Sequence, residues 1–205
     1  MRTISDTEVR SIIERVRQKV GADPERRVID SPPSPTVSGA GIHPTVDAAV
    51  TACRAAFATY RACGLDARHR IVDRVRAVMR EHARELADMA HAETGLGRAE
   101  DKLKKNLLVI EKTPGPEDLE PQTWTGDWGL TLTEPAPVGV IGAITPTTNP
   151  TATIINNTIA GISAGNGLVF NIHPNAKVVS VHTIRLINGA IVEAGGPPDL
   201  VATVP

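Results

Sequence analysis

Apolar positions near the start of the chain recur with the period of an amphipathic helix. They fall at Val9, Ile12, Ile13, Val16 and Val20, the i, i+3, i+4, i+7, i+11 pattern of one helical face. Ser5 with Glu8 matches a capping box, and Gly21 matches a helix end. A helix of this length is marginal alone, because isolated helices below ~12–15 residues are barely stable in water. We therefore expect its apolar face to dock on a partner.

The next segment, residues 22–43, has a composition that disfavours regular structure. It contains Pro24, Pro32, Pro33 and Pro35 among serine and glycine residues, which predicts an extended tether. The predicted organisation is a targeting helix over residues 1–21, a proline-rich linker over residues 22–43 and a globular part over residues 44–205. A helix on a tether is typical of a recognition peptide.

Helical periodicity dominates the first part of the globular region. One helical face is formed by Val46, Ala49, Val50, Cys53 and Phe57. Asp66 is expected to cap a second helix, which ends at residues 93–97 and whose inward positions are Ile71, Val75, Val78, Met79, Leu86 and Met89. A third helix is predicted over residues 99–112. Residues 123–133, with Trp124 and Trp128, predict a strand or hairpin.

The last 70 or so residues alternate strand and helix patterns. Residues 138–144 form a continuous apolar run, as expected of a strand covered on both faces. Helices are predicted over residues 150–164 and 175–194, and further strands over residues 168–172 and 200–204. This β-α-β-α-β order predicts a parallel sheet with right-handed crossovers. The fold class is therefore α/β, with part of a doubly wound nucleotide-binding sheet.

Composition narrows the range of partners and compartments. The net charge is −1, from 22 basic and 23 acidic residues, which gives no electrostatic case for binding nucleic acid or an anionic membrane. The two cysteines argue against a disulfide framework and favour a reducing cytosol. No continuous apolar run marks the N-terminus as a signal peptide or membrane span. No histidine pattern has the spacing of a metal site. A cytoplasmic protein without a metal is the expectation.

The turn between the first parallel strand and its helix carries the candidate chemistry. Thr145-Pro146-Thr147-Thr148-Asn149-Pro150 would lie at the carboxyl end of a strand, where open α/β sheets bind ligands. Pro150 suits the first helical position and Asn149 suits the N-cap, so one interpretation of the turn is purely structural. Alternatively, the Asn149 amide stabilises an oxyanion or phosphate at the helix start.

The same residues resemble the microcompartment-type propionaldehyde and acetaldehyde dehydrogenases, which are CoA-acylating aldehyde dehydrogenases. The resemblance includes residues 137–142, 145–151 and 154–157, together with the blocks at residues 93–97, 100–102, 113–119, 125–127 and 173–180. It runs in order through essentially the whole chain. The N-terminal helix and its tether also resemble the encapsulation peptides of such enzymes.

The resemblance implies the conversion of a short-chain aldehyde, NAD and coenzyme A into acyl-CoA and NADH, starting with attack by a cysteine thiolate. It assigns the oxyanion-binding amide to Asn149, with Thr148 as the alternative in a register shifted by one residue. Ile144, Thr145, Pro146 and Thr147 would line the nicotinamide side. His173 would stand near the adenine ribose, which leaves NAD or NADP open, or would simply cap a turn.

The cysteines decide how much of that reaction the chain is expected to perform. Cys53 lies on an inward helical face, which favours a buried structural role, and Cys63 lies at a helix-to-turn junction. In the resembled family the nucleophile comes later than Pro205. The chain is thus expected to be the cofactor-side portion of such an enzyme. The alternatives are a non-catalytic targeting or binding module and half of a split enzyme.

The expected partners follow from the same resemblance. Residues 5–20 would bind a microcompartment shell protein and place the chain in the microcompartment lumen. The segment at residues 124–133 resembles an oligomerisation strand, which predicts a homo-oligomer. The open edge and apolar face of a three-stranded sheet also predict a covering partner, such as a C-terminal half.

Overall fold

The computed structural model describes residue 7, residue 14 and residues 40–205. The chain divides into two units, Met1–Pro35 and Thr36–Pro205, and the description below concerns the second. The predicted targeting helix and most of the predicted linker lie outside the described residues. Those two expectations therefore remain predictions.

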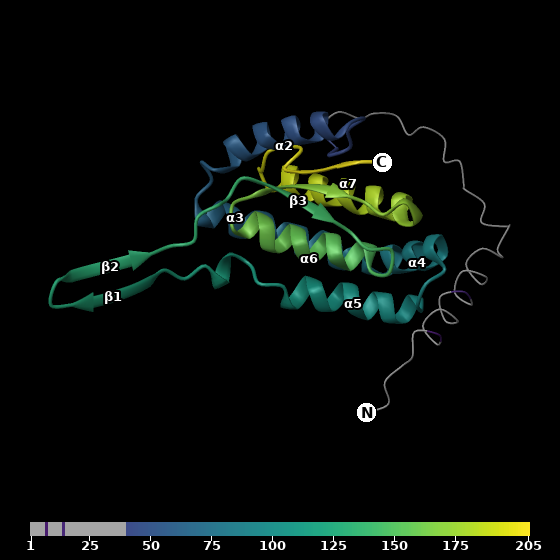
Figure 1. Ribbon diagram of the computed structural model, residues 1–205, viewed down its shortest axis with the longest axis horizontal. Helices are drawn as coiled ribbons and strands as arrows, with labels where there is room; N and C mark the ends of the chain where they lie inside the picture. The colour runs from purple at the N-terminus through teal and green to yellow at the C-terminus, as the bar shows by residue number, and fades with distance from the viewer. Residues whose placement is uncertain (1–6, 8–13, 15–39) are drawn as a thin grey trace, which may run out of the picture. The chain divides into compact units, whose positions relative to one another are not determined.

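A parallel sheet forms the middle layer of the second unit (Figure 1). Its strands are β3 (Val140–Ile144), β4 (Gly167–Asn171) and β5 (Val201–Val204), in the order β3-β4-β5. Helix α6 (Pro150–Ser163) connects β3 to β4, and the 3₁₀ turn η2 (Pro174–Ala176) with helix α7 (Lys177–Glu193) connects β4 to β5. The predicted β-α-β-α-β order and the parallel pairing are confirmed.

Helices cover the two faces of the sheet unequally. Helix α2 (Val46–Tyr60) packs on one face, mainly over β5 and β4. On the other face lie α6 and α7, while α3 (Leu65–Glu81), α4 (Ala83–Thr94) and α5 (Ala99–Lys112) pack outside them. The main core consists of fully buried aliphatic and aromatic side chains between these helices and the sheet, among them Phe170, Leu168, Ile155, Ile159, Ile184 and Ile187.

The strand predicted over residues 138–144 is shorter and more exposed than expected. It begins at Val140, and Val138 and Ile144 are 85% and 80% exposed. Within the described residues β3 is an edge strand, and α2 lies mostly over the other two strands. The prediction of burial on both faces is therefore wrong for this strand as described.

The single helix predicted from Asp66 onward is two helices. The chain leaves helical geometry at His82, with φ −93° and ψ 5°, between α3 and α4. Gly64 occupies the N-cap of α3, and Asp66 lies in the first turn. The break escaped the periodicity because Met79 and Leu86 are buried on either side of it.

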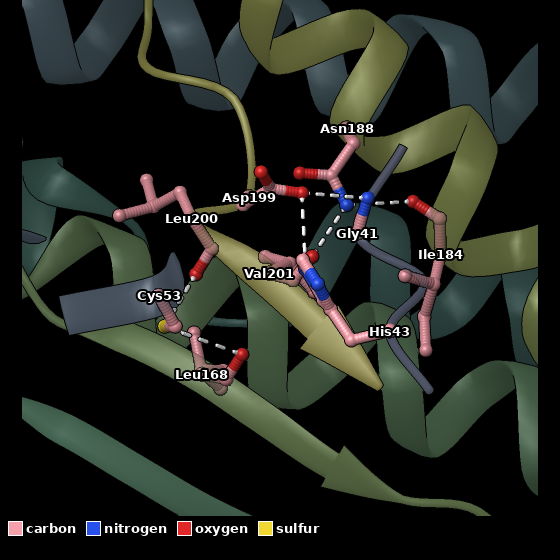
Figure 2. Close-up of polar contacts among 9 residues, drawn as sticks. All are labelled: Gly41, His43, Cys53, Leu168, Ile184, Asn188, Asp199, Leu200 and Val201. Atoms are coloured by element: carbon pink, nitrogen blue, oxygen red, sulfur yellow. Dashed lines mark hydrogen bonds and ion pairs between the residues drawn. The ribbon is translucent and has the colours of Figure 1, made fainter. Parts of the chain in front are cut away.

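The globular part begins before Pro44, within the segment assigned to the linker. Ile42 is buried and forms a parallel bridge with Thr203 of β5. The His43 amide donates to the Thr203 carbonyl at 3.0 Å, and the Thr203 amide donates to the Gly41 carbonyl at 2.7 Å. Figure 2 shows the same segment held by Asp199, which accepts from the Gly41 amide at 2.9 Å and lies 3.3 Å from His43 Nε2. A pairing this short leaves no periodic signal in sequence.

The segment predicted as a strand or hairpin is a hairpin. It follows a short 3₁₀ turn, η1 (Pro116–Asp118), and pairs β1 (Gln122–Gly126) with β2 (Gly129–Thr133) in antiparallel register. Figure 1 shows it standing away from the helices. Every residue of both strands is exposed, and four of its exposed side chains are large and apolar: Trp124, Trp128, Leu130 and Leu132.

Candidate active-site turn

The predicted turn lies at the carboxyl edge of the sheet, between β3 and α6. Its first residue, Thr145, is buried and extends the ladder, because its backbone amide donates to the Asn171 carbonyl at the end of β4 at 3.1 Å. Its hydroxyl lies 3.4 Å from the same oxygen. Pro150 starts α6, and Asn149 occupies the N-cap position, as expected. The turn is thus anchored at both ends.

The Asn149 side chain does not cap the helix that it precedes. Its backbone has φ −135° and ψ 57°, and its side chain makes no capping hydrogen bond. Instead, Asn149 Oδ1 accepts from Lys105 Nζ at 3.1 Å, and Nδ2 lies 3.5 Å from Thr148 Oγ1. The expectation that this side chain serves as an N-cap is wrong, and its Oδ1 atom faces α5.

A second lysine of α5 reaches the same turn. Lys102 is only 5% exposed, and its Nζ donates to the Thr148 carbonyl at 3.0 Å. Burial lowers the pKa of Lys102, and the neighbouring charge of Lys105 lowers it further. One turn along α5, Asn106 is buried and accepts from Thr151 Oγ1 at 2.8 Å. Polar side chains of α5 therefore join that helix to the start of α6.

The other predicted cofactor-side residues reach the same edge of the sheet. Ile144 ends β3 and is largely exposed, Pro146 is exposed, and Thr147 is half-buried with a hydroxyl that lacks a partner among the described residues. His173 follows β4 and caps η2, because its Nδ1 accepts from the Asn175 amide at 3.1 Å. This hydrogen bond supports the alternative in which His173 caps a turn.

A shallow cleft opens beside Asn149, between α5 and α6. Its volume is about 300 Å³. Apolar and amide-bearing side chains share its lining, which consists of Lys105, Leu108, Val109, Asn149, Ala152, Thr153 and Asn156. One wall is fixed by Asn156, whose Nδ2 donates to Thr113 Oγ1 at 2.8 Å.

Comparison with known proteins identifies the family of this fold and turn. The model of the aldehyde dehydrogenase family matches residues 36–205. The chain belongs to the aldehyde dehydrogenase family. Among curated relatives, it is 47% identical over 174 residues to the acetylating acetaldehyde dehydrogenase EutE of Salmonella typhimurium, covering 85% of this chain and 37% of the relative. It is 43% identical to the CoA-propanoylating propanal dehydrogenase of Citrobacter freundii, covering 85% and 38%.

Several solved structures are similar to this chain in fold and in sequence. The propionaldehyde dehydrogenase of Rhodopseudomonas palustris, with bound CoA and an acylated cysteine, matches with a TM-score of 0.79 and 48% identity over 82% of this chain and 38% of that one. An engineered glycolyl-CoA reductase with bound NADP⁺ matches with a TM-score of 0.78 and 47% identity, covering 80% and 38%. The enzyme of a Clostridium phytofermentans fucose utilisation bacterial microcompartment matches with 0.78 and 45%, also covering 80% and 38%.

This aldehyde dehydrogenase chain spans less than two fifths of the length of each of these relatives. Within the part of the chain that the structure describes, no group of three metal-ligating side chains could hold an ion. None of the described helices combines the length and apolar character that crossing a bilayer requires.

Cys53 lies far from the turn. It is buried on α2, and its sulfur lies 3.4 Å from the Leu200 carbonyl and 3.6 Å from the Leu168 carbonyl, as Figure 2 shows. Those carbonyls lie at the amino ends of β5 and β4, whereas the turn lies at the carboxyl edge, about 13 Å away at ~3.3 Å per strand residue. Burial raises the pKa of the Cys53 thiol to about 12. The buried position predicted for Cys53 is confirmed.

Sequence reasoning missed Lys102 and Lys105 as parts of the site. Lys102 falls within the block at residues 100–102 that carries the family resemblance, and the resemblance assigns it no role. A signal existed, because Lys102, Asn106 and Ile110 are spaced i, i+4, i+8 and share the buried face of α5. A lysine and an asparagine on an otherwise apolar face indicate that the face meets polar groups rather than a purely apolar core.

Proposed function

We propose that this chain contributes the cofactor-side portion of a CoA-acylating aldehyde dehydrogenase, which converts a short-chain aldehyde, NAD(P) and CoA into acyl-CoA and NAD(P)H. The observation that carries the proposal is the position of the Asn149 amide, which follows a parallel strand at the carboxyl edge of the sheet and lies beside a shallow cleft. The acylating relatives and the CoA- and NADP⁺-bound structures support the same reaction class.

In this proposal the Asn149 amide stabilises negative charge on the aldehyde oxygen. When a thiolate attacks the carbonyl, that oxygen becomes an oxyanion, and a preorganised donor lowers the energy of the transition state. Asn149 Nδ2 is suited to this role, because its Oδ1 is already engaged by Lys105. The Thr148 side chain can supply only a hydroxyl, and Thr148 is more exposed than Asn149.

The residues at the carboxyl edge fit a dinucleotide. The exposed apolar side chain of Ile144 offers a surface to a flat ring, and Pro146 and Thr147 continue that surface into the turn. His173 stands at the end of the neighbouring strand, within reach of a bound ribose in this interpretation. The nicotinamide, when bound, would accept the hydride.

Separate substitution of Asn149 and Thr148 tests the assignment in an active enzyme that contains these residues. We expect Asn149→Ala to lower kcat by roughly 10²–10³, the usual effect of removing one oxyanion donor. Thr148→Ala serves as the matched control and should stay within a fewfold of the parent. A large loss in the Thr148 variant with little loss in the Asn149 variant would assign the oxyanion to Thr148 instead.

The 205-residue chain alone should form no acyl-CoA. The physical reason is the position of Cys53, buried at the far end of the strands from the turn. The measurement is NAD(P)H formation with aldehyde and CoA, with and without a separately expressed C-terminal polypeptide of a relative. Activity from the chain alone would contradict the proposal, whereas activity only on mixing would favour the split-enzyme alternative.

Targeting and self-association complete the proposal. The helix at residues 5–20 is proposed to bind a microcompartment shell protein and place the chain in the lumen, an interpretation supported by the relative from a fucose utilisation microcompartment. A reporter fused to residues 1–43 should co-purify with shells, and a diffuse reporter would argue against targeting.

The exposed apolar hairpin at residues 122–133 is proposed as the self-association surface, to be checked by sedimentation of a Trp128→Ser variant.

A further inference from the structure

Two lysines on one face of α5 bind consecutive residues of the active-site turn. Lys102 donates to the backbone carbonyl of Thr148, and Lys105 donates to the side-chain carbonyl of Asn149. The two lysines are spaced i, i+3, so they lie side by side on the helix. Helix α5 therefore holds the turn through two oxygens, the backbone carbonyl of Thr148 and the side-chain carbonyl of Asn149.

The chemistry of these groups fixes the orientation of the Asn149 amide. An ammonium has three donors and no acceptor, so only the oxygen of an amide can face it. With Oδ1 held by Lys105, Nδ2 must point the other way. Its described contact, 3.5 Å to Thr148 Oγ1, is at the long limit for a hydrogen bond. The NH₂ group is thus left free to donate to a ligand.

The orientation matters because the two ends of an amide have opposite effects on an oxyanion. A donated N–H stabilises the developing charge, whereas a carbonyl oxygen in the same place repels it. The carbonyl and NH₂ groups have nearly the same size and shape, so packing alone selects weakly between the two orientations. A cation on the oxygen side removes that ambiguity.

Lys102 places a charged ammonium group in a buried position, which is unfavourable without compensating contacts. Its side chain is 5% exposed, and no carboxylate forms an ion pair with it among the described residues. An ammonium without a counter-ion is costly to bury. Its hydrogen bond to the Thr148 carbonyl fixes the peptide that leads into Asn149, so the buried charge has a positioning role at the site.

We propose that Lys102 and Lys105 are positioning residues that hold the Asn149 amide with its nitrogen directed at the reacting carbonyl oxygen. Lys105 orients the side chain, and Lys102 fixes the backbone beneath it. This inference rests on the proposed oxyanion role of Asn149, but the orientation itself can be measured without any activity. Neither lysine touches the reacting atoms.

The first measurement is the side-chain amide spectrum of the ¹⁵N-labelled 205-residue chain. Asn149→Ala assigns the pair of Nδ2 proton signals by removing it. Lys105→Met should shift these signals and speed their exchange with water, and Lys105→Arg should largely restore the parent spectrum, because the guanidinium also donates. The matched control is Lys104→Met, at a position with no hydrogen-bond or ion-pair partner among the described residues. Unchanged Asn149 signals in Lys105→Met would overturn the proposal.

The second measurement is steady-state kinetics in an active enzyme that contains these residues. Lys105→Met should lower kcat roughly tenfold, less than the 10²–10³ expected for loss of the donor itself, and leave KM for the aldehyde within about twofold. Lys105→Arg should recover most of kcat, because the guanidinium can also donate to Asn149 Oδ1. A residue needed only for folding stability would leave kcat of the folded enzyme unchanged. Parent-like kcat in Lys105→Met would overturn the positioning role. A parent-like kcat in Asn149→Ala would instead refute the proposed oxyanion role, and the amide spectrum would still decide the orientation.

Discussion

Cys53 offers a direct test of whether this chain holds a competent nucleophile, because its reactivity can be compared with that of Cys63 in the same molecule. Cys53 is completely buried against the amino ends of β4 and β5, whereas Cys63 is half-buried after α2. The perturbation is alkylation of the native chain by iodoacetamide at pH 8. The two cysteines are the only ones in the sequence, so each can be followed separately.

The expected difference follows from the thiolate fraction. Burial raises the pKa of Cys53 to about 12, so at pH 8 about 10⁻⁴ of the thiol is ionised. An ordinary thiol with a pKa near 8.5 is ionised to about 0.2 at that pH. Alkylation of Cys53 should therefore be slower than that of an ordinary thiol by about 10³ from ionisation alone. Exclusion of the reagent from the buried site lowers the Cys53 rate further.

Peptide mass spectrometry of timed samples gives the two rates. In the native chain Cys63 should be labelled first, and Cys53 should be labelled only as fast as the protein opens. In 6 M guanidinium chloride the two rates should agree within a fewfold, which controls for local sequence effects. Native Cys53 labelling as fast as that of Cys63 would refute the argument from burial and would reopen Cys53 as a nucleophile.

Two further predictions concern stability. Glu85 accepts from His82 and lies 3.0 Å from His182, and the His82 contact lowers the pKa of Glu85 in the folded state. Because the folded pKa lies below the unfolded one, the contact should stabilise the protein above about pH 4.5. This stabilisation should be lost as the pH falls below that value. The free energies of unfolding from urea titrations at pH 7 and pH 3.5 should differ less in Glu85→Gln than in the parent. The reduction should be under ~1 kcal/mol for so exposed a group, and equal differences would contradict the reasoning. Gly41 and Gly95 both have positive φ, but a Cβ at Gly41 would collide with neighbouring atoms and one at Gly95 would meet open space. Gly95→Ala should cost about 1–2 kcal/mol and Gly41→Ala clearly more in thermal unfolding, and equal costs would show that Gly41 is not packed against β5.

The sequence allowed the β-α-β-α-β core to be predicted because each of its elements carries its own signal. Proline at the start of α6 and glycine-rich turns after both crossover helices mark the boundaries within a few residues. The hairpin was also predictable, since its strands flank a turn bounded by Gly126 and Gly129. These signals are local, and local signals survive without knowledge of the partner elements.

The features that escaped prediction depend on contacts between distant segments. The bridge between Ile42 and Thr203 joins positions at opposite ends of residues 40–205, and no local sequence pattern near Ile42 predicts this pairing. The exposure of Ile144 depends on which strands α2 covers, which periodicity cannot say. The hydrophobic pattern told which residues are apolar but not which elements would cover them.

The turn illustrates the same division within a few residues and shows why its chemistry depends on more than its own sequence. Its position at a strand end and its N-cap residue were predicted, yet the side-chain cap expected at Asn149 is replaced by a hydrogen bond to Lys105. A short polar side chain at a helix start has two ways to be satisfied, by the helix amides or by a donor from elsewhere, and only the fold supplies the second. If the Asn149 nitrogen is the oxyanion donor, its direction is set from α5, 44 residues away in sequence. Substitutions on that helix should then alter turnover without touching the aldehyde or the cofactor.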